Sequence, residues 1–426
     1  MKVLLIGSGG REHALAIKIG ESPLLDKLFI MPGNPGTGQT GENIKINSSH
    51  GDKVLQFCKD KNIDLVVIGP EQPLVDGLGD YLSSGGFKVF GPTQKAAAIE
   101  AHKSFAKRLM KKYNIPSADF VEFTSAEYEK ARFYLKKSDY PLVIKADGLA
   151  AGKGVLICNS YNDAEKGLKE IFIDKIFGAS GDKIVVEEFM KGEEASIFAI
   201  TDGTDFICLP SSQDHKRIGD NDTGKNTGGM GAYSSAPIVT DEILSQVENK
   251  IIKPTLEGMR EEGSPFSGCL YIGLMITDEG PKVVEYNCRF GDPETQAVLP
   301  LLKGDFLKLL HSSAEGKLDK EAVHYSEGCA VCVVAASQGY PGSYQKGYEI
   351  SGLDINDKNI LIYHAGTSEL DDKIVTNGGR VLGVTAVLDN NDLRAAREKA
   401  YEAISKIHFE GIYFRKDIAV KALTRF

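Results

Sequence analysis

The chain has 426 residues, of which 42% are hydrophobic and 26% are charged, and its formal net charge is −9. This composition is typical of an ordinary soluble globular protein with two to four domains. The negative charge and the lack of a long basic run disfavour nucleic acid as the main partner, and no apolar run approaches the roughly 20 residues that span a bilayer.

The cysteines and the first residues predict a cytoplasmic protein. Seven cysteines without regular spacing fit reduced thiols. Cys329 and Cys332 have Cys-x-x-Cys spacing, but they lie in an apolar run that predicts a buried strand, so core packing is favoured over a redox or zinc site. Residues 2–6 form a strand-like run rather than a signal peptide.

Residues 2 to about 100 alternate strand-like and helix-like patterns. Short apolar runs at 3–6, 28–31 and 65–68 each lead into glycine or proline, and helix-compatible stretches lie between them. This spacing predicts βαβ units and a parallel sheet, with ligands at the carboxyl ends of the strands.

Residues 7–12 (Gly-Ser-Gly-Gly-Arg-Glu) follow the first strand and open the first helix, where backbone N–H groups attract a phosphate. Glu12 stands where a dinucleotide fingerprint has its third glycine, which favours a phosphate or phosphosugar over NAD. A tight turn that simply needs glycine is the alternative. Glu71, after the third strand, is either a ligand for hydroxyls or an amine, or a solvated loop acid.

The next region offers lysines for a nucleotide. A helix is predicted over residues 96–112, where Lys103, Lys107 and Lys111 share a face; for at least two of the three a solvated face is the favoured interpretation. Lys145 closes an apolar strand, where an ammonium group needs a partner such as a phosphate. Residues 150–154 (Ala-Ala-Gly-Lys-Gly) then form a flexible turn able to fold over phosphates.

Two further segments have several possible roles. Residues 187–190 end another apolar strand and could present their backbone to an adenine edge, although an ordinary buried strand is the alternative. Residues 211–235 are polar and rich in glycine, which predicts a long loop that acts as a lid over charged substrates. A mobile surface loop is the alternative there.

Glu285 and Asn287 alternate on a predicted strand, so their side chains share one face. A carboxylate and an amide oxygen suit octahedral magnesium, whereas a buried pair between Glu285 and Arg289 is the alternative. From about residue 327, strand-like runs at 330–336, 360–364 and 381–388 and a helix at 392–407 predict a last, mostly β domain.

These residues together resemble a known family. Lys145 with residues 151–154, residues 187–190, Glu194 and residues 285–289 are similar to the ATP-grasp fold. The whole chain resembles the phosphoribosylamine–glycine ligase family. The matching segments are residues 7–14, 33–36, 69–71, 212–217, 226–231, 287–294 and 376–380. Of these, the Asp214 loop and the 287–294 run are the most specific.

The resemblance implies an α/β fold with three parts. An N-terminal parallel-sheet (Rossmann-like) domain is expected over residues 1–103. An ATP-grasp domain with a mobile lid subdomain is expected over 104–326, with the lid at about 119–193. A small, mostly β C-terminal domain is expected over 327–426.

The resemblance also implies an activity in purine biosynthesis. ATP, glycine and 5-phosphoribosylamine would give ADP, phosphate and glycinamide ribonucleotide through glycyl phosphate, with Mg²⁺ or Mn²⁺ as the metal, in a monomer or weak homodimer. The catalytic residues would be Lys145, Asp214 and Arg289. ATP would be held by Lys107, Lys145, Gly152, Lys153, Gly154, Glu187, Glu188, Phe189, Met190 and Glu194. The other substrates would be held by Gly9, Gly10, Arg11, Asn34, Glu71, Asp214, Lys216, Arg217 and Arg289. The metal ligands would be Glu285 and Asn287.

One departure and three alternatives stay open. Many ATP-grasp enzymes carry a metal-binding carboxylate on the preceding strand, but residues 271–275 (Tyr-Ile-Gly-Leu-Met) have none, so a second metal would borrow Asp292, Glu294 or phosphate oxygens. The alternatives are another ATP-grasp ligase that activates formate or bicarbonate, as in purine metabolism or biotin carboxylases, a nucleotide-sensing protein without catalysis, and an oxidoreductase.

Overall fold

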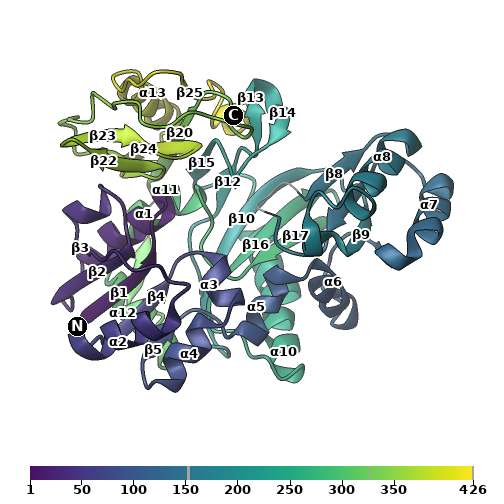
Figure 1. Ribbon diagram of the computed structural model, residues 1–426, viewed down its shortest axis with the longest axis horizontal. Coiled ribbons are helices and arrows are strands. Elements are labelled where there is room, and N and C mark those ends of the chain that lie inside the picture. The colour runs from purple at the N-terminus through teal and green to yellow at the C-terminus, as the bar shows by residue number, and fades with distance from the viewer. Residues whose placement is uncertain (151–153, 326, 425–426) are drawn as a thin grey trace.

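The computed structural model describes residues 1–150, 154–325 and 327–424. Figure 1 shows the N-terminal sheet on one side of a large central sheet and a smaller α/β subdomain, with α7 and α8, projecting on the other side. In the described residues no helix is both long and apolar enough to cross a membrane.

The N-terminal sheet is parallel and has the strand order β3-β2-β1-β4-β5, which confirms the predicted architecture. The chain leaves β1 for β2 on one side and later reaches β4 on the other, so the carboxyl end of β1 is the switch point where such sheets bind ligands. The elements are β1 (Lys2–Gly7), α1 (Gly10–Gly20), β2 (Lys27–Pro32), β3 (Glu42–Asn43), α2 (Gly51–Lys61), β4 (Leu65–Ile68), α3 (Glu71–Val75), α4 (Leu78–Ser84), β5 (Lys88–Phe90) and α5 (Gln94–Ala101).

The projecting subdomain has a four-stranded antiparallel sheet of order β6-β9-β7-β8 with its own apolar core. It occupies the residues expected for the lid, and its mobility stays a prediction. The elements are α6 (Lys103–Lys112), β6 (Phe120–Thr124), α7 (Tyr128–Lys137), β7 (Leu142–Ala146), β8 (Val155–Cys158), α8 (Tyr161–Phe172) and β9 (Lys183–Glu188).

The prediction of one helix over residues 96–112 was wrong, because α5 and α6 are separated at His102, which has an extended backbone. Asp147 explains the break. Its carboxylate accepts a hydrogen bond from the backbone N–H of Ser104 at 2.6 Å, and so it caps the first turn of α6 from a distant segment.

The central sheet runs through the rest of the chain in the order β17-β16-β10-β12-β15-β20-β24-β21. The elements of this part of the chain are, first, β10 (Glu193–Thr201), β11 (Phe206–Cys208), β12 (Ser212–Asp214), β13 (Arg217–Gly219), β14 (Thr223–Asn226), β15 (Gly231–Ser234), α9 (Asp241–Val247), α10 (Lys253–Glu261), β16 (Gly268–Thr277), β17 (Gly280–Asn287), α11 (Glu294–Val298), β18 (Leu302–Gly304), α12 (Phe306–Ala314) and β19 (Val323–Tyr325). They are followed by β20 (Cys329–Ser337), β21 (Ile360–His364), β22 (Thr367–Leu370), β23 (Lys373–Thr376), β24 (Arg380–Leu388), α13 (Leu393–Ile404), β25 (Ile412–Tyr413) and α14 (Val420–Leu423). The pairs β13–β14, β18–β19 and β22–β23 form small two-stranded sheets of their own.

The prediction of a long loop at residues 211–235 was also wrong, since this stretch contains four short strands, two of which belong to the central sheet. Several of its polar side chains find hydrogen-bond partners inside the fold. Gln213, for example, is only 3% exposed, donates to the Glu194 carbonyl and accepts from the Tyr233 hydroxyl. Polar residues can occupy buried strands when partners of this kind are present.

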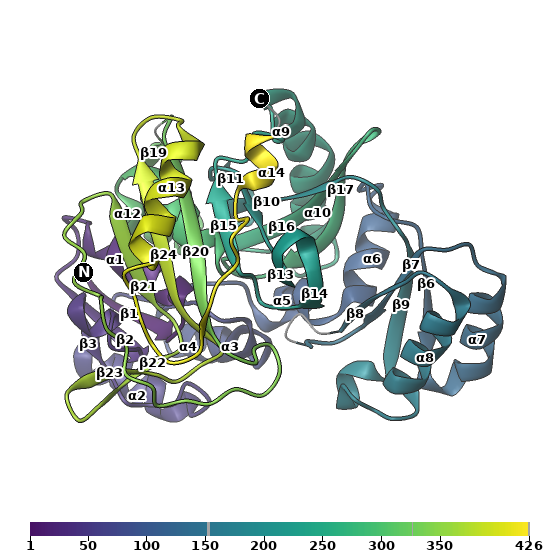
Figure 2. The ribbon, with the colours of Figure 1, turned by 90° about the horizontal axis from the view of Figure 1, so that it is seen from above.

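Most of the C-terminal strands continue the central sheet, whereas β22 and β23 form a small sheet of their own. β15 pairs with β20 in antiparallel register, and β20 pairs with β24, so these strands lie side by side (Figure 2). The strands and the helix expected after residue 327 are present, but the predicted boundary separates strands of one sheet. As a domain boundary it stays a prediction.

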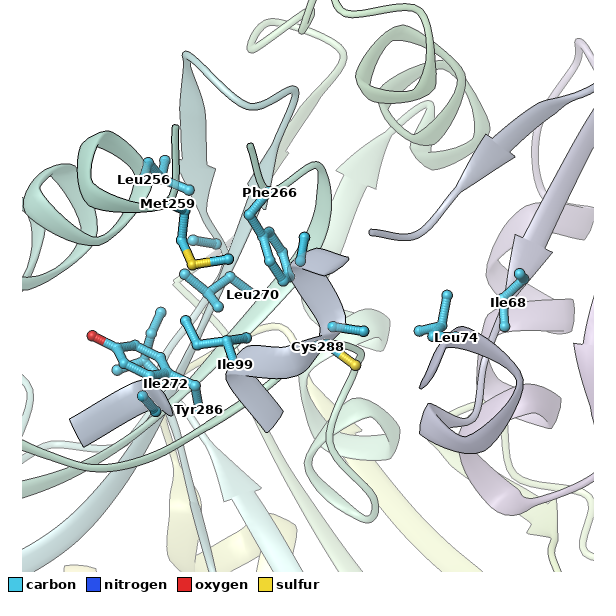
Figure 3. Packing of buried hydrophobic residues seen from close by; sticks show 14 of the residues in the cluster. Ile68, Leu74, Ile99, Leu256, Met259, Phe266, Leu270, Ile272, Tyr286 and Cys288 are labelled. Atoms are coloured by element: carbon cyan, nitrogen blue, oxygen red, sulfur yellow. The ribbon is translucent and has the colours of Figure 1, made fainter. Parts of the chain in front are cut away.

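One apolar cluster joins the parallel sheet to the central sheet. It contains Ile68 and Leu74 from the N-terminal part and Ile272 and Tyr286 from β16 and β17, with Ile99 of α5 among them (Figure 3). Burial of this surface holds β17 in a fixed place beside the parallel sheet. The opposite, polar face of β17 is therefore positioned by the core.

Two buried histidines connect the N-terminal and C-terminal parts. Nδ1 of His13, on α1, accepts a hydrogen bond from the backbone N–H of His364 at 2.9 Å, and the two rings are 5.7 Å apart. Burial, with a contribution from His364, lowers the pKa of His13 to about 3, and burial lowers the pKa of His364 to about 4. Both imidazoles are therefore neutral at neutral pH.

This contact predicts loss of stability in acid. The unfolded chain takes up protons below a pH of about 6.5, but the folded histidines do so only near pH 3 to 4, so stability falls between those limits. Each histidine should lower the free energy of unfolding by about 2 kcal/mol on going from pH 7 to pH 5. His13→Gln should reduce that pH dependence in denaturant titrations, whereas His408→Gln, at an exposed position, should not. An unchanged pH dependence in His13→Gln contradicts the assignment.

Candidate active site

A cavity of about 900 Å³ lies at the carboxyl ends of β1, β2 and β4. Its lining includes Gly7, Ser8 and Gly9 from the loop after β1, Pro32 after β2 and Pro70 after β4. The loop leads directly into α1, so backbone N–H groups and the helix dipole face this region. The cavity has the position and the electrostatics expected for a phosphorylated substrate.

Glu12 fills the space that a dinucleotide fingerprint keeps open. A Cβ atom on Gly7 would lie 2.3 Å from Glu12 Cγ, and one on Gly69 would lie 2.3 Å from Glu12 Oε1. The Glu12 carboxylate accepts hydrogen bonds from Gly9 N (2.7 Å) and Arg11 Nε (2.6 Å). The glycines at these strand ends therefore make room for Glu12 rather than for a pyrophosphate.

Asn34 holds this loop from the side. It is 6% exposed, and its amide nitrogen donates to the carbonyls of Ser8 (2.8 Å) and His364 (2.9 Å), while its oxygen accepts from Thr37 N (3.0 Å). Both the nitrogen and the oxygen of the Asn34 amide therefore have partners within the protein. A direct contact between Asn34 and substrate stays a prediction, but its support of the loop is evident.

A chain of alternating charges links the parallel sheet to β17. Glu71 Oε2 lies 3.9 Å from Arg11 Nη1 and 3.0 Å from Arg289 Nε, and Glu100 Oε1 lies 3.1 Å from Arg289 Nη2. Burial alone would raise the pKa of Glu71, but Arg289 and Arg11 outweigh it and lower the pKa to about 2. Three of the predicted substrate-binding residues, Arg11, Glu71 and Arg289, are thus brought together.

Lys107 and Lys145 converge on one carboxylate. Their Nζ atoms lie 3.6 Å and 3.0 Å from Glu187 Oε2, and all three side chains are buried. Burial lowers the pKa of Lys107 to about 8, an effect that Glu187 partly offsets. The side chain of Glu187 therefore faces the lysines, so only its backbone is left for the predicted contact with adenine.

The metal strand is β17, which carries the predicted metal ligands Glu285 and Asn287. An irregularity in this strand brings it into contact with Lys145. The register between β16 and β17 shifts so that Gly273 pairs with Glu285 and Leu274 pairs with Val283, which leaves Val284 extra. The Val284 carbonyl accepts a hydrogen bond from Lys145 Nζ at 2.9 Å. This contact joins the two segments that the sequence places about 140 residues apart.

Further residues predicted to contact the nucleotide lie at the end of β9 or just after it, and in the segment after β7. Phe189 and Met190 follow β9 and are half-buried, whereas Glu188 is exposed. Gly154 accepts a backbone hydrogen bond from Ala146 N at 2.8 Å, so the turn closes at the end of β7. Gly152 and Lys153 lie outside the described residues.

A second group of charges surrounds Glu285. Lys216 Nζ lies 2.7 Å from Glu194 Oε2 and 3.8 Å from Glu285 Oε1. Burial would raise the pKa of Glu285, but neighbouring lysines, with Lys216 first, lower it below its ordinary value. For Asp214, burial raises the pKa, since nearby carboxylates offset the effect of Lys216. Glu285 is thus ionised and available to a cation.

The donor set of β17 fits a magnesium ion. Glu285 and Asn287 share one face of the strand, while Tyr286 points into the core and its hydroxyl lies 2.7 Å from Thr255 Oγ1. Within the described residues no group of three or more histidine, cysteine or acidic side chains could hold a metal alone. One carboxylate and one amide match Mg²⁺, which keeps waters and binds substrate phosphates.

Two other residues with predicted roles already form contacts within the protein. Asp292 Oδ2 lies 3.0 Å from Arg380 Nη2, and Asp292 Oδ1 accepts from Gln296 Nε2 at 2.8 Å. Arg217 donates to the Gly224 carbonyl at 2.8 Å inside the β13–β14 hairpin. The number of metals and a substrate contact for Arg217 stay predictions.

Sequence reasoning gave no role to Glu100 and Arg380. Arg380, at the start of β24, donates to the carbonyls of Gly228 (2.6 Å) and Asp292 (2.7 Å), so the C-terminal part reaches the site. Arg380 lies in residues 376–380, one of the segments that match the family, but no function was predicted for it. Glu100 is a single acid among the apolar residues 96–101, and a buried charge of this kind indicates a specific partner.

Comparisons with known proteins identify the family of the chain. Three family models match the chain in order: the phosphoribosylglycinamide synthetase N domain at residues 1–100, its ATP-grasp (A) domain at 101–295 and its C domain at 330–421. Phosphoribosylamine–glycine ligase of Caldanaerobacter subterraneus subsp. tengcongensis is 48% identical over 98% of this chain and 99% of its own length. The same-named protein of Escherichia coli O157:H7 is 46% identical over 100% and 99%.

Solved structures agree as well. The crystal structure of phosphoribosylamine–glycine ligase from Thermotoga maritima has a TM-score of 0.84 and 37% identity, over 98% of this chain and 100% of that one. The biotin carboxylase domain of Hydrogenobacter thermophilus 2-oxoglutarate carboxylase, determined with MgADP, ADP and bicarbonate, shares the fold, with a TM-score of 0.73 and 14% identity over 97% and 91% of the two chains. The chain belongs to the phosphoribosylglycinamide synthetase family.

Proposed function

We propose that this protein is an ATP-dependent ligase that joins glycine to 5-phosphoribosylamine and forms glycinamide ribonucleotide, ADP and phosphate in purine biosynthesis. The observation that carries the proposal is the contact between Lys145 of the lid subdomain and β17: its Nζ reaches both Glu187 and the Val284 carbonyl. Family membership supplies the substrates. We further propose a cytoplasmic monomer or weak homodimer with small-molecule partners only.

The chemistry needs two transfers. A carboxylate is a poor acyl donor, so an oxygen of the glycine carboxylate attacks the γ-phosphorus of ATP, the bond from phosphorus to the bridging oxygen breaks, and ADP leaves. The amine nitrogen of phosphoribosylamine then attacks the carbonyl carbon of glycyl phosphate, loses a proton and expels phosphate. Catalysis of this kind consists mainly of positioning and charge neutralisation, and no nucleophile from the protein is required.

In this scheme the buried lysines receive the phosphates. Lys107 and Lys145 already face one shared carboxylate, and phosphate oxygens would take over part of that role. Glu285 and Asn287 would hold Mg²⁺, or Mn²⁺ in its place, which supplies further neutralisation of phosphate charge. The remaining proposed ATP contacts are Gly152, Lys153, Gly154, the residues from Glu187 to Met190, and Glu194.

Glycine and phosphoribosylamine would meet between the metal strand and the cavity. Asp214 would accept hydrogen bonds from the glycine ammonium group, with Lys216 beside it, and Arg289 would bind the glycine carboxylate. The loop with Gly9, Gly10 and Arg11, supported by Asn34, would hold the phosphate of phosphoribosylamine, and Glu71 its polar groups. A closed lid over the site would protect glycyl phosphate from water.

The direct test is phosphate release by purified protein with ATP, glycine and freshly generated phosphoribosylamine, each omitted in turn. Turnover should need all three, and neither formate nor bicarbonate should replace glycine. Equal turnover with formate or bicarbonate would favour another ATP-grasp ligase, and nucleotide binding without any turnover would favour a sensing protein.

Glu285→Ala should reduce turnover by at least about 10²-fold, because the transferring phosphoryl group loses the carboxylate that holds its counter-ion. The measurement is kcat at saturating ATP and Mg²⁺. Glu279→Ala, which removes a carboxylate with 77% side-chain exposure from the turn before β17, is the matched control and should keep the wild-type rate. A wild-type rate in Glu285→Ala would remove the metal assignment.

The lowered pKa of Lys107 predicts that kcat/KM for ATP depends on pH, with a fall (an alkaline limb) near the pKa of Lys107. The ammonium group is charged below a pH of about 8 and neutral above it, so kcat/KM for ATP should fall as the pH rises through about 8. Lys107→Gln should have a lower kcat/KM without this limb, whereas Lys111→Gln, at an exposed position on α6, should keep it. The assignment is wrong if Lys107→Gln retains the limb.

A further inference from the structure

Glu100 is a buried acid that bonds to three consecutive residues at and just beyond the end of β17. It lies on α5 and is 7% exposed. Its Oε2 accepts a hydrogen bond from the backbone N–H of Cys288 at 2.7 Å, and its Oε1 lies 3.1 Å from Arg289 Nη2. With its amide nitrogen toward Glu100, Asn287 donates to the same Oε1 at 3.0 Å. Burying a carboxylate costs free energy unless hydrogen bonds and opposite charges compensate for it, as these partners do.

The contact with Asn287 selects one orientation of its amide. The two oxygens of Glu100 already face the Cys288 N–H and the Arg289 guanidinium group, so this carboxyl group acts as a hydrogen-bond acceptor and attracts the amide nitrogen rather than the amide oxygen. The oxygen, which is the atom that a magnesium ion needs, is then turned away from Glu100. Removing a group that orients a metal ligand in this way typically lowers metal affinity or activity by about 10- to 100-fold.

The contact with Arg289 fixes the guanidinium plane. Arg289 has Glu71 on its Nε and Glu100 on its Nη2, so two acids from different helices, α3 and α5, hold one cation. Its Nη1 donates to the Phe290 carbonyl at 3.1 Å. Each nitrogen of the guanidinium group thus has a partner, and rotation of the group would break at least one of these bonds.

We infer that Glu100 is a positioning residue that orients the metal ligand Asn287 and the carboxylate-binding Arg289 together. The inference rests on the proposed function. A single acid from the end of the N-terminal part then couples the metal site to the amino-acid site, because one oxygen, Oε1, serves both side chains.

The test is Glu100→Gln, which keeps the shape but places an amide where a carboxylate accepted three hydrogen bonds. Binding of Mn²⁺ in the presence of ADP, measured by the paramagnetic signal without turnover, should weaken by about tenfold. KM for glycine should rise by about the same factor, with a smaller change in KM for ATP. Glu262→Gln, which alters a carboxylate bonded to Lys112 and Tyr113, is the matched control and should change neither quantity.

Wild-type affinity for Mn²⁺ and wild-type KM for glycine in a folded Glu100→Gln protein would overturn the inference. If that variant does not fold, Glu100→Asp keeps the charge and shortens the reach, and unchanged values there would overturn it equally. The proposed function fails separately, because in that case the wild-type protein itself would bind no Mn²⁺ with ADP.

Discussion

The site depends on charged side chains that are buried beside partners of opposite sign. Moving one charge out of water costs several kcal/mol, and removing one partner of a buried pair leaves the other uncompensated, at a cost of about 3–5 kcal/mol. Glu187 neutralises Lys107 and Lys145, and Arg289 lies between Glu71 and Glu100. Because each pair joins different elements, the charges also fix how those elements meet. Phosphates and a carboxylate can enter such a site by replacing part of this pairing.

The apolar core supports these charges from behind. Tyr286 and Cys288 are packed on the face of β17 opposite to Glu285 and Asn287, and the same cluster contains residues of the parallel sheet and of α5 (Figure 3). The period-2 alternation of a strand therefore separates a face for packing from a face for chemistry. The extra residue at Val284 interrupts that regularity at the point where Lys145 arrives. Packing and catalysis thus use one strand without competing for the same residues.

The sequence predicted what depends on local pattern. The parallel sheet followed from apolar runs that end in glycine, and the shared face of Glu285 and Asn287 followed from strand alternation. The strands within residues 211–235 were missed because polar side chains such as Gln213 are paired with neighbouring strands, here through Tyr233 of β15 and Glu194 of β10, which a local pattern does not reveal. The break at His102 was missed for a similar reason, since Asp147 caps α6 from another segment. Glu100 could have been suspected from its apolar neighbours, but only the fold reveals its partners.

The central claim is that a magnesium nucleotide is held between β7 and β17. A crystal structure with Mg²⁺ and a non-hydrolysable ATP analogue tests it most directly. The account predicts phosphate oxygens beside Lys107 and Lys145 and the metal on Glu285 and Asn287. An analogue bound instead in the cavity at the ends of β1 and β4, with the β7–β17 site empty, would contradict it.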